Sequence, residues 1–369
     1  GVDLIYDDDG KVAGVRTGDK GVDQNGEPKD NFEPGMDLES PVTIIGEGPR
    51  GHLVRILTKK YNLDEGKNPQ AYETGCKEVL EFPEGTIKDG FVYLTAGYPL
   101  KMDTFGGAFI YSMGGDRACI GLLAALDTPD PGLDVHYLLQ KLKMHPAIRE
   151  ILGKGKVIKY GAKTVTVGGW SSIPKLYAPG AMIVGDSASF LNAARIKGIH
   201  LSMKSGMLAA ETAFAAMKSG ENTDEAMSLF KKLVDDSWIR EEMEPTQNFH
   251  ANFANHGLIG GGMRFGIQKV LGPGKPAAYH ADHEGMQKMS HYYKDNKLPD
   301  RDDVPYDGTY LIDKLTDVYM SGTKHDEHQP CHLLIQDTEI CATRCAEEYG
   351  NPCERFCPAQ VYNMVENEE

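Results

Sequence analysis

The chain has 369 residues, enough for two or three domains with a sizeable core, and 40% of its residues are apolar. Its 54 acidic residues outnumber the 39 basic ones, and the net charge of −15 argues against a general nucleic-acid binder, which needs a basic face. No apolar run approaches the roughly 18–20 residues of a membrane-spanning helix, which leaves attachment to a membrane surface open.

The N-terminal part contains strand, turn and helix signals. Residues 2–17 are typical of a β-hairpin, and since a domain seldom begins this way, we expect a fragment of a longer protein. Residues 19–38 predict an exposed excursion. A strand at 41–45, the turn Gly46-Glu47-Gly48 and a helix at 51–61 follow the order of a Rossmann-like domain. We expect this segment to be a later strand of that domain, with the first strand missing.

The next part of the chain predicts an antiparallel sheet. Alternating apolar and polar residues indicate strands at 74–82, 90–94, 106–113, 118–126 and 156–167. The first four have no helix between them, so we expect them to form a separate domain inserted into the first one. Residues 133–152 predict a helix, which Pro146 interrupts.

A strand, a turn and a helix between residues 180 and 218 predict a ligand site. Residues 181–184 predict a short buried strand, Gly185 and Asp186 a turn that lets the backbone approach a ligand, and residues 199–218 a helix. A carboxylate at the end of a strand accepts hydrogen bonds from ribose or ribityl hydroxyls, and a helix start favours an anion. This pattern fits a flavin site, although a plain strand–turn–helix fits it as well.

Two helical segments follow. Residues 223–240 predict one helix with a capped start. Residues 249–271 are apolar and glycine-rich, and they carry Arg264 and Lys269. They predict either a segment that lies in a membrane interface or a glycine-rich pair of core helices. Residues 310–321 predict a further helix.

Seven cysteines divide into two groups. Cys76 and Cys119 stand in apolar surroundings and are expected to be core thiols. The other five crowd into the C-terminal tail, which favours metal or redox chemistry over a secreted disulfide framework: Cys331, Cys341, Cys345, Cys353 and Cys357. The run Cys341-x3-Cys345-x7-Cys353-x3-Cys357-Pro358 leaves an iron–sulfur cluster, a zinc site and simple thiols all open.

A set of short motifs occurs in one order along the whole chain. They include Thr43-Ile-Ile-Gly-Glu-Gly48, Gly97-Tyr-Pro-Leu100, Phe105-Gly-Gly107, Tyr160-Gly-Ala-Lys163, Ser172-Ile-Pro-Lys-Leu176, Ile196-Lys-Gly198, Met203-Lys-Ser-Gly206 and Arg355-Phe-Cys-Pro-Ala359. Together they resemble the electron transfer flavoprotein–ubiquinone oxidoreductase family. The resemblance implies a mixed α/β fold: a partial FAD domain of the glutathione-reductase-like class, an inserted antiparallel-sheet quinone domain and a partial iron–sulfur domain.

The resemblance also implies cofactors and their sites, with electron transfer through the cofactors instead of catalytic side chains. FAD is expected to contact Gly48, Gly185, Asp186, Asn192, Lys197, Gly198 and Ile199. A quinone is expected at Gly97, Tyr98, Phe105, Gly106 and Gly107. Cys357 is expected to bind a [4Fe–4S] cluster whose other three ligands lie beyond residue 369. Cys341, Cys345 and Cys353 are weaker candidates for metal binding.

The implied domains are a partial FAD domain at 1–70, the quinone domain at 71–178, the return to the FAD domain at 179–240, and a membrane-contact segment with the partial iron–sulfur domain at 241–369. The implied function is to pass electrons from reduced electron transfer flavoprotein through the cluster and FAD to ubiquinone or menaquinone. The fragment alone is expected to be inactive.

The implied location is the surface of the bacterial cytoplasmic or mitochondrial inner membrane, facing the cytoplasm or matrix, with monotopic attachment. Two alternatives remain open. One is a related flavin-dependent reductase of isoprenoid lipids, and the other is a cysteine-rich zinc docking module without redox activity.

Overall fold

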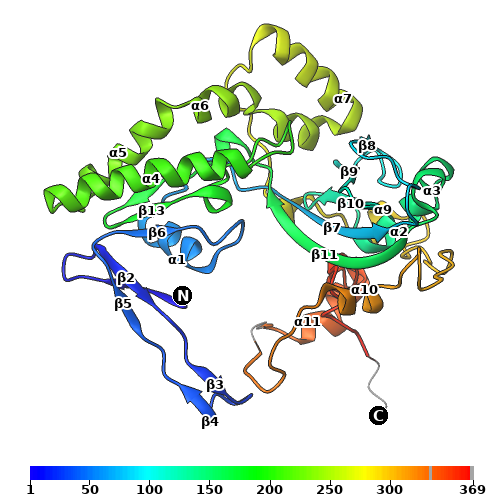
Figure 1. The fold of residues 1–369 in the computed structure, drawn as a ribbon, viewed down its shortest axis with the longest axis horizontal. Coiled ribbons are helices and arrows are strands. Elements are labelled where there is room, and N and C mark those ends of the chain that lie inside the picture. Colours follow the sequence, from blue (N-terminus) through cyan, green and yellow to red (C-terminus); the bar gives the residue numbers. More distant parts are fainter. Residues whose placement is uncertain (332–334, 366–369) are drawn as a thin grey trace.

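The computed structural model describes residues 1–331 and 335–365, which form a mixed α/β structure, as expected. Figure 1 shows an α/β unit beside an antiparallel sheet, with one long bent helical segment above them and the C-terminal helices below the sheet. The functional residues predicted from the sequence lie mostly where the α/β unit meets the sheet.

The α/β unit is built around a small sheet whose strands come from distant parts of the chain. The strands are β6 (Thr43–Ile45), β13 (Ala181–Ile183) and β12 (Tyr177–Ala178). β13 lies in the middle, parallel to β6 and antiparallel to β12. Two helices lie on opposite sides of this sheet (Figure 1): α1 (His52–Tyr61) and α4 (Ile199–Ser219). Buried Leu57, Met182 and Leu208 belong to one core cluster, which joins both helices to the sheet.

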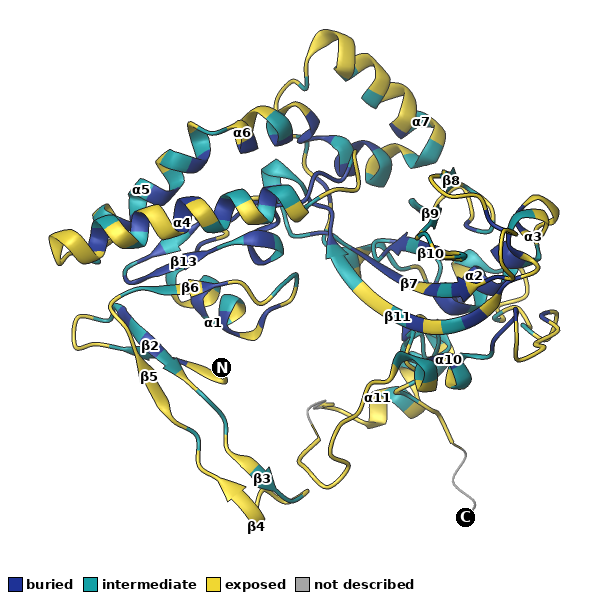
Figure 2. Ribbon diagram, viewed as in Figure 1, coloured by how far each residue is buried: buried dark blue, intermediate teal, exposed yellow. Residues whose placement is uncertain are grey.

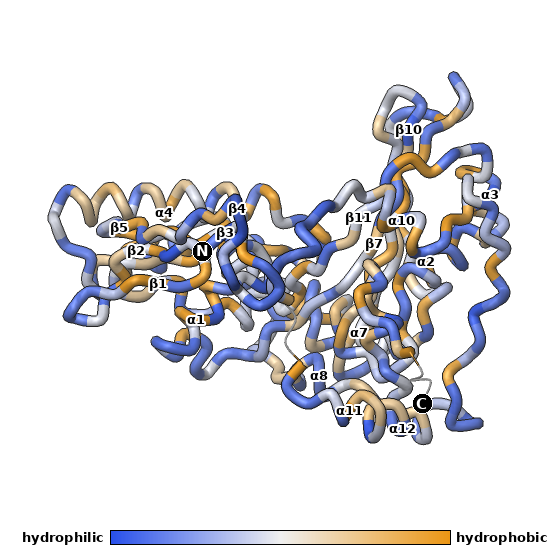
Figure 3. The backbone as a smooth tube through the Cα atoms, turned by 90° about the horizontal axis from the view of Figure 1, so that it is seen from below, coloured by the Kyte–Doolittle hydropathy of each residue, from blue (hydrophilic) through white to orange (hydrophobic). Residues whose placement is uncertain are grey.

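Helix α4 is long because few of its residues oppose helix formation. It ends at Gly220. Gly220 takes the left-handed conformation (φ 76°), and its N–H bonds to the carbonyl of Ala216. Figure 3 shows apolar residues along most of this helix. One face packs into the core, and the other exposes Ile199, Met203, Met207, Phe214 and Met217.

The N-terminal strands confirm the predicted hairpin. They form a separate three-stranded sheet of β1 (Asp3–Tyr6), β2 (Val12–Arg16) and β5 (Asp37–Glu39). Leu4 pairs with Val15, which sets the register of the first two strands. The expected excursion is an exposed hairpin that consists of β3 (Lys20–Val22) and β4 (Pro28–Glu33).

The large sheet has five antiparallel strands in the order β11-β7-β10-β9-β8. Their bounds are β7 (Tyr72–Glu81), β8 (Val92–Ala96), β9 (Gly106–Ser112), β10 (Arg117–Ala125) and β11 (Lys156–Thr166). The five strands predicted for this region are therefore confirmed. Leu80, Ile110 and Ile120 of the sheet share a second core cluster with Leu139 and Leu152.

Helices cover this second core. They are α2 (Val135–Met144) and α3 (Pro146–Leu152). Pro146 is the first residue of α3, so the predicted interruption is confirmed. Asp134 begins α2, because its side chain accepts a hydrogen bond from the Tyr137 N–H at 3.0 Å.

The single helix expected at 223–240 is wrong. The structure has two helices there, α5 (Asp224–Asp235) and α6 (Trp238–Met243). Ser237 adopts extended backbone angles between them, and its Oγ accepts a hydrogen bond from the Ile239 N–H at 3.2 Å. A second cap inside the segment therefore ends one helix and begins another.

Segment α7 (Phe249–Leu271) is a pair of helices joined at a kink. Gly257 has a φ of 65° and a ψ of −174°, which only glycine adopts readily. Within residues 1–331 and 335–365, no helix combines the length and the apolar character needed to cross a membrane.

The remaining elements are short. They are the 3-10 turns η1 (Trp170–Ser172), η2 (Gly185–Ala188) and η3 (Glu244–Thr246), and the helices α8 (Asp282–Gly285), α9 (Met289–Tyr292), α10 (Lys314–Ser321), α11 (Glu339–Ala342), α12 (Arg344–Tyr349) and α13 (Cys353–Phe356). The helix predicted at 310–321 begins at Lys314, because the Asp313 side chain caps it by accepting from the Thr316 N–H at 3.0 Å.

A third, smaller core cluster joins the α/β unit, the sheet and α7. It includes Ala71, Val167, Leu191, Ala251 and Tyr279. Figure 2 shows the buried segments that meet at this junction, in contrast to the exposed second half of α7. The candidate site lies around this junction.

Candidate active site

The Gly-Asp turn after β13 has the geometry expected of a ligand-binding turn. Gly185 has a φ of 62°, a conformation that strains any other residue, and its N–H donates to Ser205 Oγ at 3.0 Å. Asp186 follows it, and burial raises the pKa of its carboxyl, while Lys163 and Ser202 oppose this shift. Ser187 accepts a hydrogen bond from the Gly48 N–H at 2.8 Å, which fastens the two predicted cofactor turns together.

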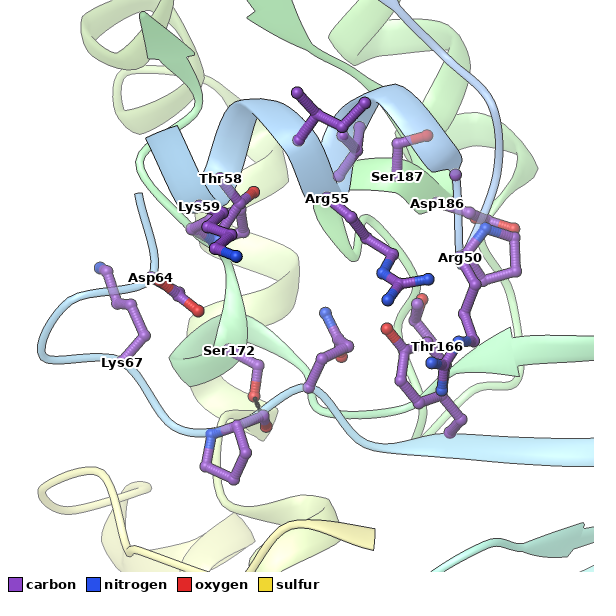
Figure 4. A pocket seen from close by; sticks show the side chains of 18 of the residues that line it. Arg50, Arg55, Thr58, Lys59, Asp64, Lys67, Thr166, Ser172, Asp186 and Ser187 are labelled. Carbon is purple, nitrogen blue, oxygen red and sulfur yellow. Dashed lines mark hydrogen bonds between the residues drawn. The ribbon is translucent and has the colours of Figure 1, made fainter. Parts of the chain in front are cut away.

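A polar cavity of about 720 Å³ opens beside these turns, and we call it the polar cavity. Asp186 lines it, as do Arg50, Arg55, Lys59 and Lys67. Figure 4 shows Arg55 and Lys59 extending from α1 over the cavity, with Arg50 and Asp186 at one end. Cationic side chains beside a half-buried carboxylate can bind a ligand that carries both phosphates and hydroxyls. The residues present therefore fit the phosphate and ribityl part of FAD.

A second cavity of about 390 Å³ is mostly apolar, and we call it the apolar cavity. It brings together four predicted residues, namely Phe105, Gly106 and Gly107 from the quinone set and Lys197 from the flavin set. Gly106 has to be glycine because its φ is 152° and a Cβ there would lie 2.3 Å from the carbonyl oxygen of Leu123. Apolar side chains supply most of the remaining wall: Val92, Leu94, Val165, Val167, Leu191 and Phe249.

The two cavities share a wall. Tyr72 lines the polar cavity, and the next residue, Glu73, lines the apolar one. On the paired strand β11, Thr166 faces the polar cavity, whereas Val165 faces the apolar cavity. Successive side chains of a strand point to opposite faces, so the first residues of β7 and the last of β11 separate the cavities by one layer of backbone.

The other predicted flavin residues lie near these cavities, but not all of their side chains point into them. Asn192 is buried, and its Nδ2 donates to Glu242 Oε1 at 3.2 Å, so its side chain braces the loop before α4. Its N–H also bonds to the Lys197 carbonyl at 2.9 Å. Gly198 caps α4, and Ile199, the first residue of that helix, is 81% exposed.

Gly97 and Tyr98 directly follow Ala96, which pairs with the predicted quinone residue Gly107 in the sheet. Neither lines the apolar cavity. The Tyr98 ring packs 5.5 Å from the ring of His145, and its hydroxyl donates to the Lys141 carbonyl at 3.4 Å. The turn therefore contacts α2 and the start of α3.

Sequence reasoning missed a buried titratable group at the apolar cavity. Glu73 is 8% exposed, and burial raises its pKa to about 7, although His250 opposes this shift. On β7, Glu73 shares a face with Gly75 and Lys77, and this sequence pattern does not indicate that Glu73 is buried. His250, 2% exposed, has its Nε2 3.4 Å from Asp127 Oδ2.

Among the described residues, one group of His, Cys or acidic side chains has the spacing of a metal site: Glu78, His136 and Asp317. The ammonium of Lys143 already contacts the Glu78 carboxylate, and Gln140 Nε2 donates to it at 2.6 Å. His136 Nε2 lies 2.8 Å from Asp317 Oδ2. With a cation already present, this group fastens α10 to β7 and α2 without a metal.

The tail cysteines do not form a metal site within the described part of the chain. Cys357 is buried, and its Sγ accepts a hydrogen bond from the Val361 N–H at 3.5 Å. The carbonyl of Pro358, the next residue, accepts a hydrogen bond from the Tyr160 hydroxyl at 2.8 Å, which ties this turn to β11. Burial raises the pKa of Cys345 and of Cys353, which favours protonated thiols there.

Comparisons with known proteins agree with one another. The family model described as ETF-QO, ubiquinone-binding, matches residues 72–165, and the model described as electron transfer flavoprotein-ubiquinone oxidoreductase, 4Fe-4S, matches residues 308–369. The electron transfer flavoprotein-ubiquinone oxidoreductase of Pseudomonas aeruginosa is 36% identical over 369 residues, which are 100% of this chain and 66% of that protein. A probable electron transfer flavoprotein-ubiquinone oxidoreductase of Acinetobacter baylyi is 34% identical, with 100% and 67% covered.

Among solved structures, a geranylgeranyl bacteriochlorophyll reductase-like protein from Thermoplasma acidophilum is similar in fold. The TM-score is 0.51 at 16% sequence identity, and the match covers 96% of this chain and 67% of that one. The chain spans 57–67% of the length of curated relatives that it matches.

Proposed function

Because the chain belongs to the electron transfer flavoprotein–ubiquinone oxidoreductase family, we propose that it is part of a flavin-dependent enzyme that passes electrons from reduced electron transfer flavoprotein to a quinone. The observation that carries this proposal is the shared wall: a polar and an apolar cavity lie on opposite faces of the same pair of strands. A cofactor in one cavity and a quinone in the other would be close enough for direct electron transfer.

The polar cavity is the proposed site for the phosphate and ribityl part of FAD. Arg50 and Arg55 would neutralise the phosphates, and the Asp186 carboxylate would accept hydrogen bonds from ribityl hydroxyls. The start of α4, at Ile199 with Lys197 and Gly198 just before it, would direct its free N–H groups toward the flavin ring. When bound, FAD supplies a centre that takes up and releases electrons one or two at a time.

The apolar cavity is the proposed site for the head group of ubiquinone or menaquinone. Its lining by Phe105, Gly106 and Gly107 supports this, and so does the match of the ubiquinone-binding family model to residues 72–165. We place the quinone domain at residues 71–178, between the two parts of the FAD domain at 1–70 and 179–240.

The C-terminal part, residues 241–369, is the proposed membrane-contact segment and partial iron–sulfur domain. Cys357 is the proposed cluster ligand, and the 4Fe-4S family model at residues 308–369 supports it. Of the cysteines in the described residues of this part, Cys357 alone is buried, and these residues supply no complete set of ligands. The other three ligands would then come from outside the described residues.

Attachment to a membrane surface is proposed through the second half of α7, which we call the apolar stripe. Its exposed residues recur every three or four positions, so they share one helical face: Ile259, Met263, Ile267 and Val270. Arg264 and Lys269 are exposed on the same helix and could contact anionic head groups. Leu258 N–H bonds to the carbonyl of Met102, so the stripe lies beside the sheet domain. The membrane would be the bacterial cytoplasmic or the mitochondrial inner one.

The proposal can be tested on a full-length version of the protein. Purified protein is expected to contain FAD, iron and acid-labile sulfide, and to reduce ubiquinone-1 when supplied with reduced electron transfer flavoprotein. Zinc in place of iron, with no flavin absorbance, would support the docking module and contradict the proposal. FAD with iron but no quinone reduction would contradict the assignment of the acceptor.

A further inference from the structure

Four titratable side chains form a cluster at the apolar cavity, and each belongs to a different part of the fold. Glu73 is at the start of β7 and lines the cavity. Asp127 follows β10, His250 is in the first turn of α7, and Asp282 begins α8. Electrostatic interactions link them, because the charges of His250 and Asp127 act on both Glu73 and Asp282.

The hydrogen bonding of this group is incomplete. His250 is buried; its Nε2 lies 3.4 Å from Asp127 Oδ2 without the geometry of a hydrogen bond, and its Nδ1 has no hydrogen-bond partner among the described residues. Asp282 Oδ2 accepts from the Tyr72 N–H at 3.0 Å, whereas its Oδ1 is also unpartnered within the described chain. Buried polar groups are normally paired, so unpaired donors and acceptors in one cluster point to a functional role.

Among the charged side chains on the surrounding elements, Glu73 is the one that lines the apolar cavity and can release a proton near neutral pH. Lys197 lines the same cavity, but its Nζ donates to the Ile196 carbonyl at 3.2 Å. Arg50 acts on Asp282 from the polar side, and the Tyr279 ring packs edge-on against His250 at 4.7 Å. Burial raises the pKa of Glu73 to about 7 and that of Asp282 to about 6, so both can exchange a proton near neutral pH.

We propose that Glu73 donates a proton to the quinone carbonyl that faces it, and that His250, Asp127 and Asp282 form the route by which Glu73 regains a proton. This inference rests on the proposed function, because it assumes that a quinone occupies the apolar cavity. In this route His250 connects Glu73 with Asp282, since an imidazole can accept a proton at one nitrogen and release one from the other.

The chemistry balances as follows. Reduction of a quinone to a quinol takes two electrons and two protons, and both C=O bonds become C–OH. The electrons come from the reduced cofactor of the proposed function. Glu73 supplies one proton and becomes a carboxylate, which takes up a proton from solvent along the route formed by half-buried Asp282, Asp127 and His250. The second carbonyl is at the far end of the ring and takes its proton from solvent at the cavity mouth, where Val92, Leu94 and Ile196 are exposed.

The test uses full-length enzyme with its FAD content measured, and ubiquinone-1 as the acceptor. Glu73→Gln cannot donate an acidic proton, so kcat is expected to fall about 10²-fold, the typical contribution of a general acid. KM and FAD content are expected to stay near the wild-type values. Glu73→Asp is expected to restore part of kcat. Glu81→Gln is the matched control, because Glu81 is on the same strand but exposed at its other end.

Two further readouts separate proton donation from a structural role. In the wild type, kcat is expected to fall as pH rises through about 7, the pKa of Glu73, and this step is expected to vanish in Glu73→Gln. Infrared spectra are expected to show a protonated-carboxyl C=O band that titrates near neutral pH and is missing in the variant.

An active wild type whose Glu73→Gln variant keeps kcat, pH profile and infrared band would overturn this inference alone. A flavin-loaded wild type that reduces no quinone would overturn the proposed function and this inference together.

Discussion

Replacing Lys143 by methionine leaves the Glu78 carboxylate inside the core without its ammonium partner. Both side chains are fully buried, and they connect α2 to β7 beside Asp317 of α10. Methionine occupies a similar volume and avoids a large cavity, so the variant reports mainly on the lost charge. The expected cost is about 3–5 kcal/mol, the usual penalty for removing one partner of a buried ion pair.

The cost is expected to depend on pH. Burial raises the pKa of Glu78 from 4.5 to about 7, even with Lys143 present. The native state therefore binds this proton more tightly than the unfolded chain, so stability falls as pH rises from about 4.5 to about 7. Without Lys143 the native pKa is higher still, so the variant keeps losing stability above pH 7. At pH 6 its carboxyl is protonated, and the penalty is smaller.

Thermal unfolding followed by circular dichroism at pH 6 and pH 8 measures this difference. At pH 8 the Lys143→Met variant is expected to melt about 6–20 °C below the wild type, from about 2–4 °C per kcal/mol. The double variant with Glu78→Gln is expected to recover much of the loss. Lys141→Met, which removes an exposed ion pair from the same helix, is the control and is expected to change stability by less than about 1 kcal/mol. Equal losses at both pH values, or a double variant as unstable as the single one, would refute this reasoning.

The remaining predictions concern the proposed sites in full-length protein. Asp186→Ala removes a charge-assisted hydrogen bond of about 1.5–3 kcal/mol, so FAD titration is expected to show about tenfold or weaker binding; unchanged affinity would remove Asp186 from the site. Ile259→Glu with Ile267→Glu is expected to abolish co-sedimentation with anionic liposomes, whereas exposed Met36→Glu leaves it unchanged. Binding that survives would restore the core-helix interpretation of α7. Cys357→Ala is expected to abolish the electron paramagnetic resonance signal of a reduced cluster, and a signal that persists would reassign the ligand.

The sequence predicted local structure well where one physical signal dominated. Alternation over residues 71–126 identified the antiparallel strands there, and Pro146 identified the break between α2 and α3. The signal failed at Ser237, because a helix-capping side chain inside an amphipathic stretch looks like any polar surface residue. Gly257 likewise bends α7 through a backbone conformation that composition does not reveal.

The site was predicted only in part, because its main features depend on which segments meet in space. Gly185, Asp186 and the Phe105-Gly106-Gly107 segment at the start of β9 were predicted by local pattern and by family resemblance. Glu73 was missed because its burial and its charged neighbours, His250 and Asp127, depend on how elements distant in the sequence pack together. Tyr98 was included because of its motif, yet its ring packs on His145 instead of facing the apolar cavity.

The shared wall also limits how this chain can change in length. Val165 pairs with Glu73, and Thr166 pairs with Tyr72. Inserting or deleting one residue in β11 beyond the irregularity between Val157 and Lys159 would turn every later side chain to the opposite face. Valine would then face the polar cavity, and threonine the apolar one. A single-codon insertion or deletion in this strand would damage both cavities at once, so length variation is expected to be confined to loops or to steps of two residues.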